Sequence, residues 1–361
     1  MTLSSEEFSI LRLIRTPSVG PQTFWKLHHK FSSAQSIIDH WPEVQSILKR
    51  PLPLIHETQV LEEVEQTLKK GAGFLFYKDN RYPVCLSENF DRPPVLTFQG
   101  QIDLLKQKKI AIVGARNASS HGCKMAYGIA KDMGEKGWSV VSGLARGIDS
   151  AAHQGSLKTG TIAILGNGIN TIYPEENKNI QSEIAEKGLL LSEFPLEAEP
   201  HVGHFPKRNR LIASLAQGIV VIEAAYQSGS LLTAQYGLEK GKDIFAVPGS
   251  PMDPRCRGSN RLIKQGAVLT ESAMDVLEVL DSAEWVALYK NRTTIRKSEK
   301  ISPLAPDSLL SHLSVIPLSI DELAERSQLS LAQLSAALTD LELGGQITKH
   351  PGNKVSLTLQ G

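Results

Sequence analysis

Three cations and an aromatic ring stand where a helix is expected to begin. The segment His-Phe-Pro-Lys-Arg-Asn-Arg leads into the apolar run Leu-Ile-Ala-Ser-Leu-Ala. Its cations are Lys207, Arg208 and Arg210, and its ring is Phe205. Because bare backbone N–H groups make a helix N-terminus positive, cations there are unfavourable unless an anion binds with them. The segment therefore predicts a bound anion, and the ring favours an anion that carries a flat base.

Glycine-containing loops follow five of the expected strands, and such loops can hold an anion. Glycine lets backbone N–H groups approach an oxyanion closely, serine hydroxyls add donors, and arginine adds a planar charge. Each loop by itself is equally well explained as a tight turn between strand and helix. The five loops together favour an anionic ligand. The residues expected to contact it are Gly114, Arg116, Ser142, Gly143, Arg146, Gly147, Ser228, Gly229 and Ser230, with Phe205, Lys207, Arg208, Asn209 and Arg210.

Short β-branched runs alternate with longer helical patterns through the middle of the chain. Near-continuous apolar strands separated by helices are typical of a parallel sheet that is covered on both faces. In such sheets ligands bind at the carboxyl ends of the strands, where the loops above lie. The sequence thus predicts a doubly wound α/β domain, with strands near residues 110–113, 139–141, 161–165, 189–191, 219–222, 244–247 and 267–269.

Helical patterns occupy residues 1–70. Within them, residues 16–21 resemble the turn of a helix–hairpin–helix motif, whose backbone amides can hold a phosphate. Only one of the two usual glycines, Gly20, is present. A packing module is therefore favoured over a module that contacts DNA.

The C-terminal part reads as a winged helix. A polar linker over residues 283–302 precedes helices near 307–313, 320–326 and 331–343, and a hairpin of strands 346–350 and 354–359. The third helix carries Asp340 and Glu342 but no Lys or Arg. Because phosphate contacts supply most DNA affinity, this helix is a poor groove reader, and a protein-contacting or structural role is favoured.

Composition narrows the class of protein. The 361 residues include 39 basic and 38 acidic side chains, so the net charge is +1 and a nucleic-acid partner would need a local cluster. The three cysteines are far apart and form no CxxC pair, which argues against a disulfide framework and against a zinc site. No run of about 18 apolar residues occurs. We expect a reduced, cytoplasmic protein without a membrane segment, metal or cofactor.

Motifs for nucleotide chemistry are incomplete. The loop at Gly166 and Gly168 has two glycines of the dinucleotide-binding fingerprint and lacks the third, and no P-loop occurs. Glu193 and Glu223 stand at strand ends, but no nucleophile elbow or metal motif accompanies them. We expect these glutamates to pair with Arg116 or Arg208. Similarly, Asp149 and His153 are four residues apart on a helix and predict a local hydrogen bond rather than a catalytic pair.

The motifs quoted so far resemble those of the DNA-processing protein DprA (Smf) family. The resemblance rests on residues 114–116, 142–149, 205–212 and 228–234, with 82–83, 93–96 and 247–249 in support. It runs from about residue 70 to 280 and extends more loosely to both ends. It implies a helical SAM/HhH-like domain at 1–70, an extended Rossmann-like domain with a mostly parallel sheet at 71–282, the linker, and a winged helix at 303–361.

The resemblance also implies a function. Members of the family bind single-stranded DNA without catalysis, dimerise through the Rossmann-like domain, protect incoming DNA and load the recombinase RecA during natural transformation. Their DNA pocket maps here onto Gly114, Arg116, Phe205, Lys207, Arg208 and Arg210. Some relatives carry a basic residue where Val202 stands, between His201 and His204. The charge of the pocket is therefore expected to rise below about pH 6.5, as these histidines protonate.

Two alternatives stay open. One is a nucleotide-processing hydrolase similar to the phosphoribohydrolases, but Gln235 and Tyr236 stand where the carboxylates of those enzymes would be. Release of adenine from AMP would favour it. The other is a transcription regulator, which would require residues 301–361 alone to bind specific duplex DNA.

Overall fold

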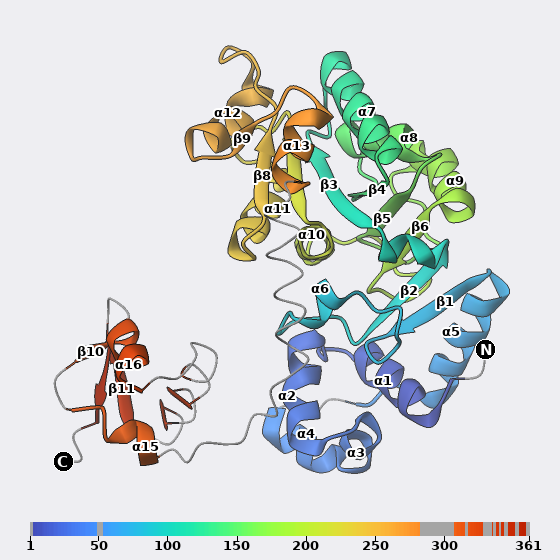
Figure 1. Cartoon of the computed structure of the whole chain (residues 1–361). Helices are drawn as coiled ribbons and strands as arrows, with labels where there is room; N and C mark the ends of the chain where they lie inside the picture. Colours follow the sequence, from blue (N-terminus) through green and yellow to red (C-terminus); the bar gives the residue numbers. More distant parts are fainter. Residues whose placement is uncertain are drawn as a thin grey trace. The chain divides into compact units, whose positions relative to one another are not determined.

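The structure is a computed structural model that describes residues 3–48, 53–281, 307–314, 317–327, 334, 337–338, 341–342, 346–350 and 354–358. The chain divides into two compact units, Met1–Trp285 and Val286–Gly361 (Figure 1). The predicted linker at 283–302 lies outside the described residues. Among the residues described, no helix combines the length and apolar character that crossing a membrane requires.

One mixed sheet organises the first unit. Its described strands are β1 (Ala72–Phe76), β2 (Val95–Gly100), β3 (Lys108–Gly114), β4 (Trp138–Ser142), β5 (Thr161–Leu165), β6 (Leu189–Ser192), β7 (Gly218–Ile222), β8 (Asp243–Ala246) and β9 (Val268–Leu269). They lie in the order β1-β2-β6-β5-β4-β3-β7-β8-β9. The neighbouring strands β6-β5-β4-β3-β7-β8-β9 all pair in parallel. Strand order reverses between β3 and β7, so the predicted doubly wound sheet is confirmed.

The sequence did not predict β1 and β2. They pair antiparallel with each other, and β2 pairs antiparallel with β6, which extends the sheet at one edge. Gly73 lies within β1 and Gly100 ends β2, and glycine weakens the pattern by which a strand is recognised. In addition, no short turn joins the two strands.

Helices cover both faces of this sheet (Figure 1). Alternate residues of β3 point to opposite faces: Ile110 and Ile112 belong to one core cluster, and Ala111 and Val113 belong to the other. Both sides are therefore apolar, as the continuous hydrophobic runs indicated. The helices are α6 (Val84–Ser87), α7 (Ser120–Glu135), α8 (Ile148–Ser156), α9 (Lys178–Lys187), α10 (His204–Leu215), α11 (Gly229–Glu239), α12 (Arg257–Lys264) and α13 (Ala273–Leu280).

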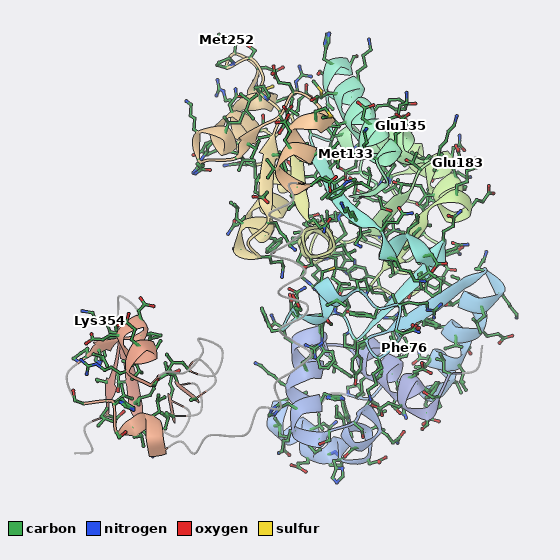
Figure 2. The ribbon with its side chains drawn as sticks, in the orientation of Figure 1. Phe76, Met133, Glu135, Glu183, Met252 and Lys354 are labelled. Carbon is green, nitrogen blue, oxygen red and sulfur yellow. The ribbon has the colours of Figure 1, made fainter. Side chains whose placement is uncertain are left out.

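The first cluster contains residues of α7, α8 and α13, whereas the second contains residues of α6, α10, α11 and α12. Met133 of α7, labelled in Figure 2, is fully buried in the first cluster. Most of α10 is buried as well, from Arg208 to Leu215 with the exception of Arg210. The core therefore fixes this helix, and its exposed N-terminus lies near the carboxyl ends of the central strands.

The N-terminal region is helical, as expected. Its described helices are α1 (Ser5–Arg15), α2 (Pro21–Phe31), α3 (Ala34–Asp39), α4 (Trp41–Leu48) and α5 (Glu57–Lys69). Their shared core includes Phe74 and Phe76 of β1, so these helices pack against the antiparallel end of the sheet (Figure 2 labels Phe76).

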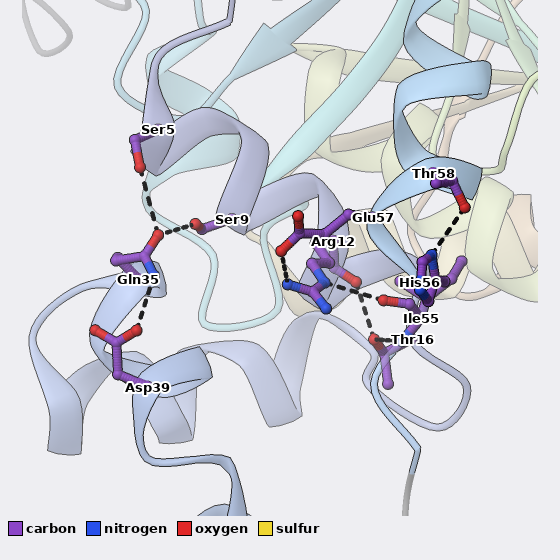
Figure 3. A network of polar contacts seen from close by, with 10 residues as sticks. All are labelled: Ser5, Ser9, Arg12, Thr16, Gln35, Asp39, Ile55, His56, Glu57 and Thr58. Atoms are coloured by element: carbon purple, nitrogen blue, oxygen red, sulfur yellow. Dashed lines mark hydrogen bonds and ion pairs between the residues drawn. The ribbon is translucent and has the colours of Figure 1, made fainter.

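Polar contacts also join the N-terminal helices to one another (Figure 3). Arg12 of α1 donates to the carbonyl of Ile55 at 2.9 Å and pairs with Glu57 of α5 at 2.6 Å. Ser9 of α1 donates to Gln35 of α3 at 2.7 Å. These contacts hold α3 and α5 against α1.

The second unit has the elements of the predicted winged helix in its described parts. These are α15 (Asp307–Leu310), β10 (Leu318–Ser319), α16 (Ile320–Ser327), β11 (Ile347–His350) and β12 (Lys354–Leu357). The strands lie in the order β10-β12-β11, and β10 was not predicted. Residues 334, 337–338 and 341–342 of the expected third helix are helical. Asp340 and the turn at 351–353 lie outside the described residues.

Candidate functional site

A pocket lies at the carboxyl ends of β3, β4 and β5, beside the start of α10. Each strand contributes the loop that follows it, and α10 contributes the first turns of its exposed end. None of the lining residues is an aspartate or a glutamate. The lining consists of Arg116, Gly143, Leu144, Ala145, Arg146, Gly166, Asn167, Tyr173, Pro174, Phe205 and Arg208.

The ring of Phe205 lies at the centre of this pocket. The guanidinium carbon of Arg116 is 5.1 Å from the ring centroid, and that of Arg208 is 5.9 Å from it. The ring of Tyr173 is 5.8 Å away and tilted by 34°. Both cations are within the range of cation–π attraction. Because Phe205 is only half-buried, the pocket offers an aromatic surface close to two positive charges.

Arg208 is buried below the ring. Its guanidinium donates to the carbonyl of Gly143 and, at 3.2 Å, to that of Ile164, and its Nε donates to Asn209 at 3.0 Å. Burial lowers the pKa of Arg208, and the neighbouring Asp149 opposes that effect. Because the side chain is buried, its charge is weakly screened and acts strongly on a ligand in the pocket.

Gly143 connects Arg208 to its counter-charge. The N–H of Gly143 donates to the Asp149 carboxylate at 3.2 Å, and its carbonyl accepts from Arg208. A Cβ on Gly143 would lie 1.6 Å from the Arg208 Nη1 atom, so a larger residue would force the guanidinium to move. Burial raises the pKa of Asp149, whereas the Arg208 charge lowers it. The missing side chain of Gly143 therefore leaves room for the close approach of Arg208.

Two further glycines are explained by backbone geometry rather than by contact with an anion. Gly114 ends β3, and a Cβ there would lie 1.8 Å from the carbonyl oxygen of Ile222 on β7. Gly147 precedes α8 with φ at 76°, a conformation that favours glycine. Neither residue is among those that line the pocket.

Three more cations lie at or beside the opening. Arg116 and Lys207 are exposed, and neither makes an ion pair in the part of the chain that the structure describes. Arg146 is 3.2 Å from Glu176, and both side chains are more than half exposed. Because exposed pairs of this kind contribute little free energy, Arg146 can exchange Glu176 for an anionic ligand.

Arg210 does not point into the pocket. Its guanidinium lies 2.5 Å from Glu193 Oε1 and donates to the carbonyl of Asp91 at 3.0 Å. Successive residues of a helix are 100° apart, so Arg208 and Arg210 leave α10 on nearly opposite sides. Arg210 is thus neutralised by carboxylates on the side away from Phe205.

The expected partners of the two glutamates were wrong. Glu193 pairs with Arg210 rather than with Arg116 or Arg208. Glu223 accepts the N–H of Ser119 at 2.7 Å and the Ser119 hydroxyl, at the start of α7. Neither carboxylate therefore pairs with Arg116 or Arg208.

The predicted serines lie away from the pocket lining. Ser142 is fully buried and donates to the carbonyl of Ile112 at 2.6 Å. Ser228 caps α11 by accepting the N–H of Ser230 at 3.3 Å. Asn209 of α10 donates to the carbonyl of Gly229 at 3.1 Å, which ties this loop to α10.

The predicted hydrogen bond between Asp149 and His153 was also wrong. Asp149 accepts backbone N–H groups, whereas Nδ1 of His153 contacts the Thr161 hydroxyl at 2.7 Å. His153 is fully buried, and burial lowers its pKa to about 3. The histidine is a neutral part of the core below the site.

The histidine at the start of α10 is held in place. His204 stacks on Phe194 with ring centroids 3.9 Å apart, and its Nδ1 atom lies 3.1 Å from the Gly166 carbonyl. Partial burial lowers the pKa of His204, so its charge appears at a lower pH than that of a free histidine.

Sequence reasoning missed Tyr173. This residue comes from the connection between β5 and α9, and only the folded chain brings it to Phe205. The one indication in the sequence was the Tyr-Pro pair at 173–174, which places an aromatic ring a few residues after the Gly166 loop. Tyr226, an exposed ring in the loop after β7, does not line the pocket and lies beside Arg261, with 4.9 Å between the guanidinium carbon and the ring centroid.

Three family profiles match the chain in succession. They are described as "DprA-like N-terminal HHH domain" at residues 4–65, "DNA recombination-mediator protein A" at 73–281, and "DprA winged helix domain" at 297–353. The central match alone covers more than half of the chain.

Relatives agree with these profiles. Protein Smf of Escherichia coli is 36% identical over 280 residues, which are 76% of this chain and 75% of that protein. DNA processing protein DprA of Streptococcus pneumoniae is 44% identical over 201 residues, or 55% of this chain and 71% of that protein. The DNA processing protein DprA of Bacillus subtilis is 41% identical over 215 residues, which are 59% of this chain and 72% of that protein.

Two solved structures share the fold. The crystal structure of DprA from Streptococcus pneumoniae matches with a TM-score of 0.65 and 32% identity, over 77% of this chain and 99% of that one. The structure of DprA from Helicobacter pylori, which was described for its single-stranded DNA binding mode, matches with a TM-score of 0.54 and 28% identity. The match covers 58% of this chain and 95% of that one. By its domains, its relatives and its fold, this chain belongs to the DNA recombination-mediator protein A (DprA/Smf) family.

Proposed function

We propose that this protein binds single-stranded DNA in the pocket around Phe205, protects it and passes it to the RecA recombinase, without catalysing a reaction on it. One observation carries the proposal. The Phe205 ring lies within 6 Å of both the Arg116 and the Arg208 guanidinium groups, in a lining without carboxylates. An aromatic face for a base and cations for the backbone are what sequence-independent binding of single strands uses.

Charge around the pocket supports the same ligand. Lys207 and Arg116 are exposed and unpaired among the described residues, and the partner of Arg146 is exposed. Arg116 also lowers the pKa of Arg208, so the two cations disfavour each other while the pocket is empty. A phosphate between them would relieve this repulsion. The relative from Helicobacter pylori, whose structure was described for its single-stranded DNA binding mode, supports the choice of ligand.

The hydrolase alternative finds less support. Gln235 is exposed on α11 and donates to Glu239 at 3.0 Å, a contact within the helix. The carboxylates nearest to strand ends, Glu193 and Glu223, are engaged with Arg210 and Ser119. Incubation of the purified protein with AMP should therefore release no adenine, and release of adenine would favour the alternative.

Fluorescence anisotropy with a labelled oligo-dT, titrated at several salt concentrations, tests the binding proposal. Each phosphate neutralised on a single strand contributes a slope of about −0.7 to the plot of log affinity against log salt. Arg116→Ala should weaken binding and make this slope shallower by about 0.7. Lys158→Ala, an exposed cation before β5 at the opposite edge of the sheet, is the control. No binding at low salt, or equal binding by the Arg116 variant, would refute the proposal.

The family resemblance also supports a homodimer formed through the Rossmann-like domain, and transfer of DNA to RecA in the cytoplasm. Sedimentation of the full chain should give twice the mass of a monomer. In a second assay, RecA assembly on oligo-dT coated with a single-strand-binding protein should be faster with this protein than without it. A monomer, or an unchanged RecA rate, would contradict the respective proposal.

A further inference from the structure

A second hollow lies on the same unit, between α2 and the loop that follows α6. It is lined by Gln22, Trp25, Lys26, His29 and Phe90. The Phe90 ring is 74% exposed, although phenylalanine is usually buried. An exposed ring beside a cation is a surface on which a nucleic-acid base can stack.

The electrostatics of this hollow favour an anionic partner. No carboxylate lines it, and Lys26 and His29 make no ion pair among the described residues. The guanidinium of Arg92 lies 3.6 Å from the Trp25 ring centroid and adds a second permanent cation to that of Lys26. The nearest acidic neighbour in the chain, Asp91, already faces Arg210.

The loop that carries Phe90 is anchored on both sides. On one side, the carbonyl of Asp91 accepts from Arg210 of α10 at 3.0 Å. On the other side, the carbonyl of Arg92 accepts from Trp25 Nε1 of α2 at 2.7 Å. Figure 1 shows the α6 segment between α2 and α10, in agreement with these bonds. Phe90 is therefore presented from a fixed loop, which lowers the entropic cost of binding.

Helix α10 contacts both the loop that carries Phe90 and the pocket around Phe205. Lys207 and Arg210 are three residues apart, so they share a face of α10, and Arg210 reaches the loop of Phe90. Lys207 is exposed and lies between Phe205 and Arg210 along the helix. Because Arg210 is itself neutralised by Glu193 and Asp91, Lys207 is an exposed cation on this face of α10 that a strand running from the pocket to the hollow can contact.

We propose that the hollow formed by Trp25, Lys26, His29 and Phe90 is a second contact site for the same single strand, in which Phe90 stacks on a base. The N-terminal helices then contribute directly to DNA binding. This proposal rests on the function proposed for the pocket. Stacking of one base on an aromatic side chain is worth at least about 1 kcal/mol, so loss of the Phe90 ring should weaken binding about fivefold or more.

Oligo-dT strands of about 6 and about 30 nucleotides, within and above the range of a single site, test this proposal. In anisotropy titrations of the full chain, Phe90→Ala and Lys26→Ala should each weaken binding of the long strand more than binding of the short one. Phe90→Trp should restore it. Leu61→Ala on α5, which also truncates an exposed apolar side chain, and Lys158→Ala are the controls.

Cross-linking gives an independent measurement. A long strand that carries photoreactive thymines should mark peptides with Trp25 or Phe90 in addition to those with Phe205. If Arg116→Ala weakens binding but both Phe90→Ala and Lys26→Ala match the wild type and no such peptide is marked, the second site is refuted and the pocket stands. If the wild-type chain binds neither strand, both proposals fail.

Discussion

Replacement of Gly143 by alanine should destabilise the protein and weaken its DNA binding. The new Cβ would lie 1.6 Å from Nη1 and 2.2 Å from Cζ of Arg208, so the guanidinium has to move. In moving, it gives up its bonds to the carbonyls of Gly143 and Ile164. Hydrogen bonds of a charged group contribute about 1.5 to 3 kcal/mol each, and partial rehydration of the guanidinium offsets some of this. We expect a loss of about 3 kcal/mol.

Gly128→Ala is the matched control. Gly128 lies inside α7, and a Cβ there meets nothing within 4 Å. Since alanine is favoured over glycine inside a helix by about 1 kcal/mol, this variant should be more stable than the wild type. Urea unfolding followed by circular dichroism gives both free energies of unfolding, and anisotropy gives the oligo-dT affinity. If Gly143→Ala unfolds at the same urea concentration as the wild type, the structural role assigned to Arg208 is wrong.

Two further predictions concern the free energy of unfolding. Burial lowers the pKa of His153 to about 3, whereas an unfolded histidine titrates near 6.5. The unfolded state therefore binds the proton more readily, and stability should fall by about 2 kcal/mol between pH 6.5 and 5. His153→Gln should lose this dependence, and an equal dependence in both proteins would contradict the assignment. Arg210→Ala leaves Glu193 buried without its partner and should cost about 3 kcal/mol in urea unfolding, whereas Lys187→Ala, from the exposed pair with Glu183, should change little.

Much of the fold and part of the site follow from local sequence. Strands such as β5 are continuous apolar runs because helices cover both faces of the sheet, and that pattern is visible without coordinates. The helix that begins at His204 and the glycine loops after the strands are equally local features. They sufficed to predict that Phe205, Arg116 and Arg208 would meet at one edge of the sheet.

The tertiary structure decided which charges are available. Helix geometry separates Arg208 from Arg210 by about 200°, but it does not say which of the two faces the pocket. That depends on Glu193 and Asp91, which lie 17 and 119 residues away in the chain and neutralise Arg210. Tyr173 reaches Phe205 by a similar long-range approach. Local sequence records the type and order of side chains, whereas pairing between distant segments depends on packing that no short window of sequence contains.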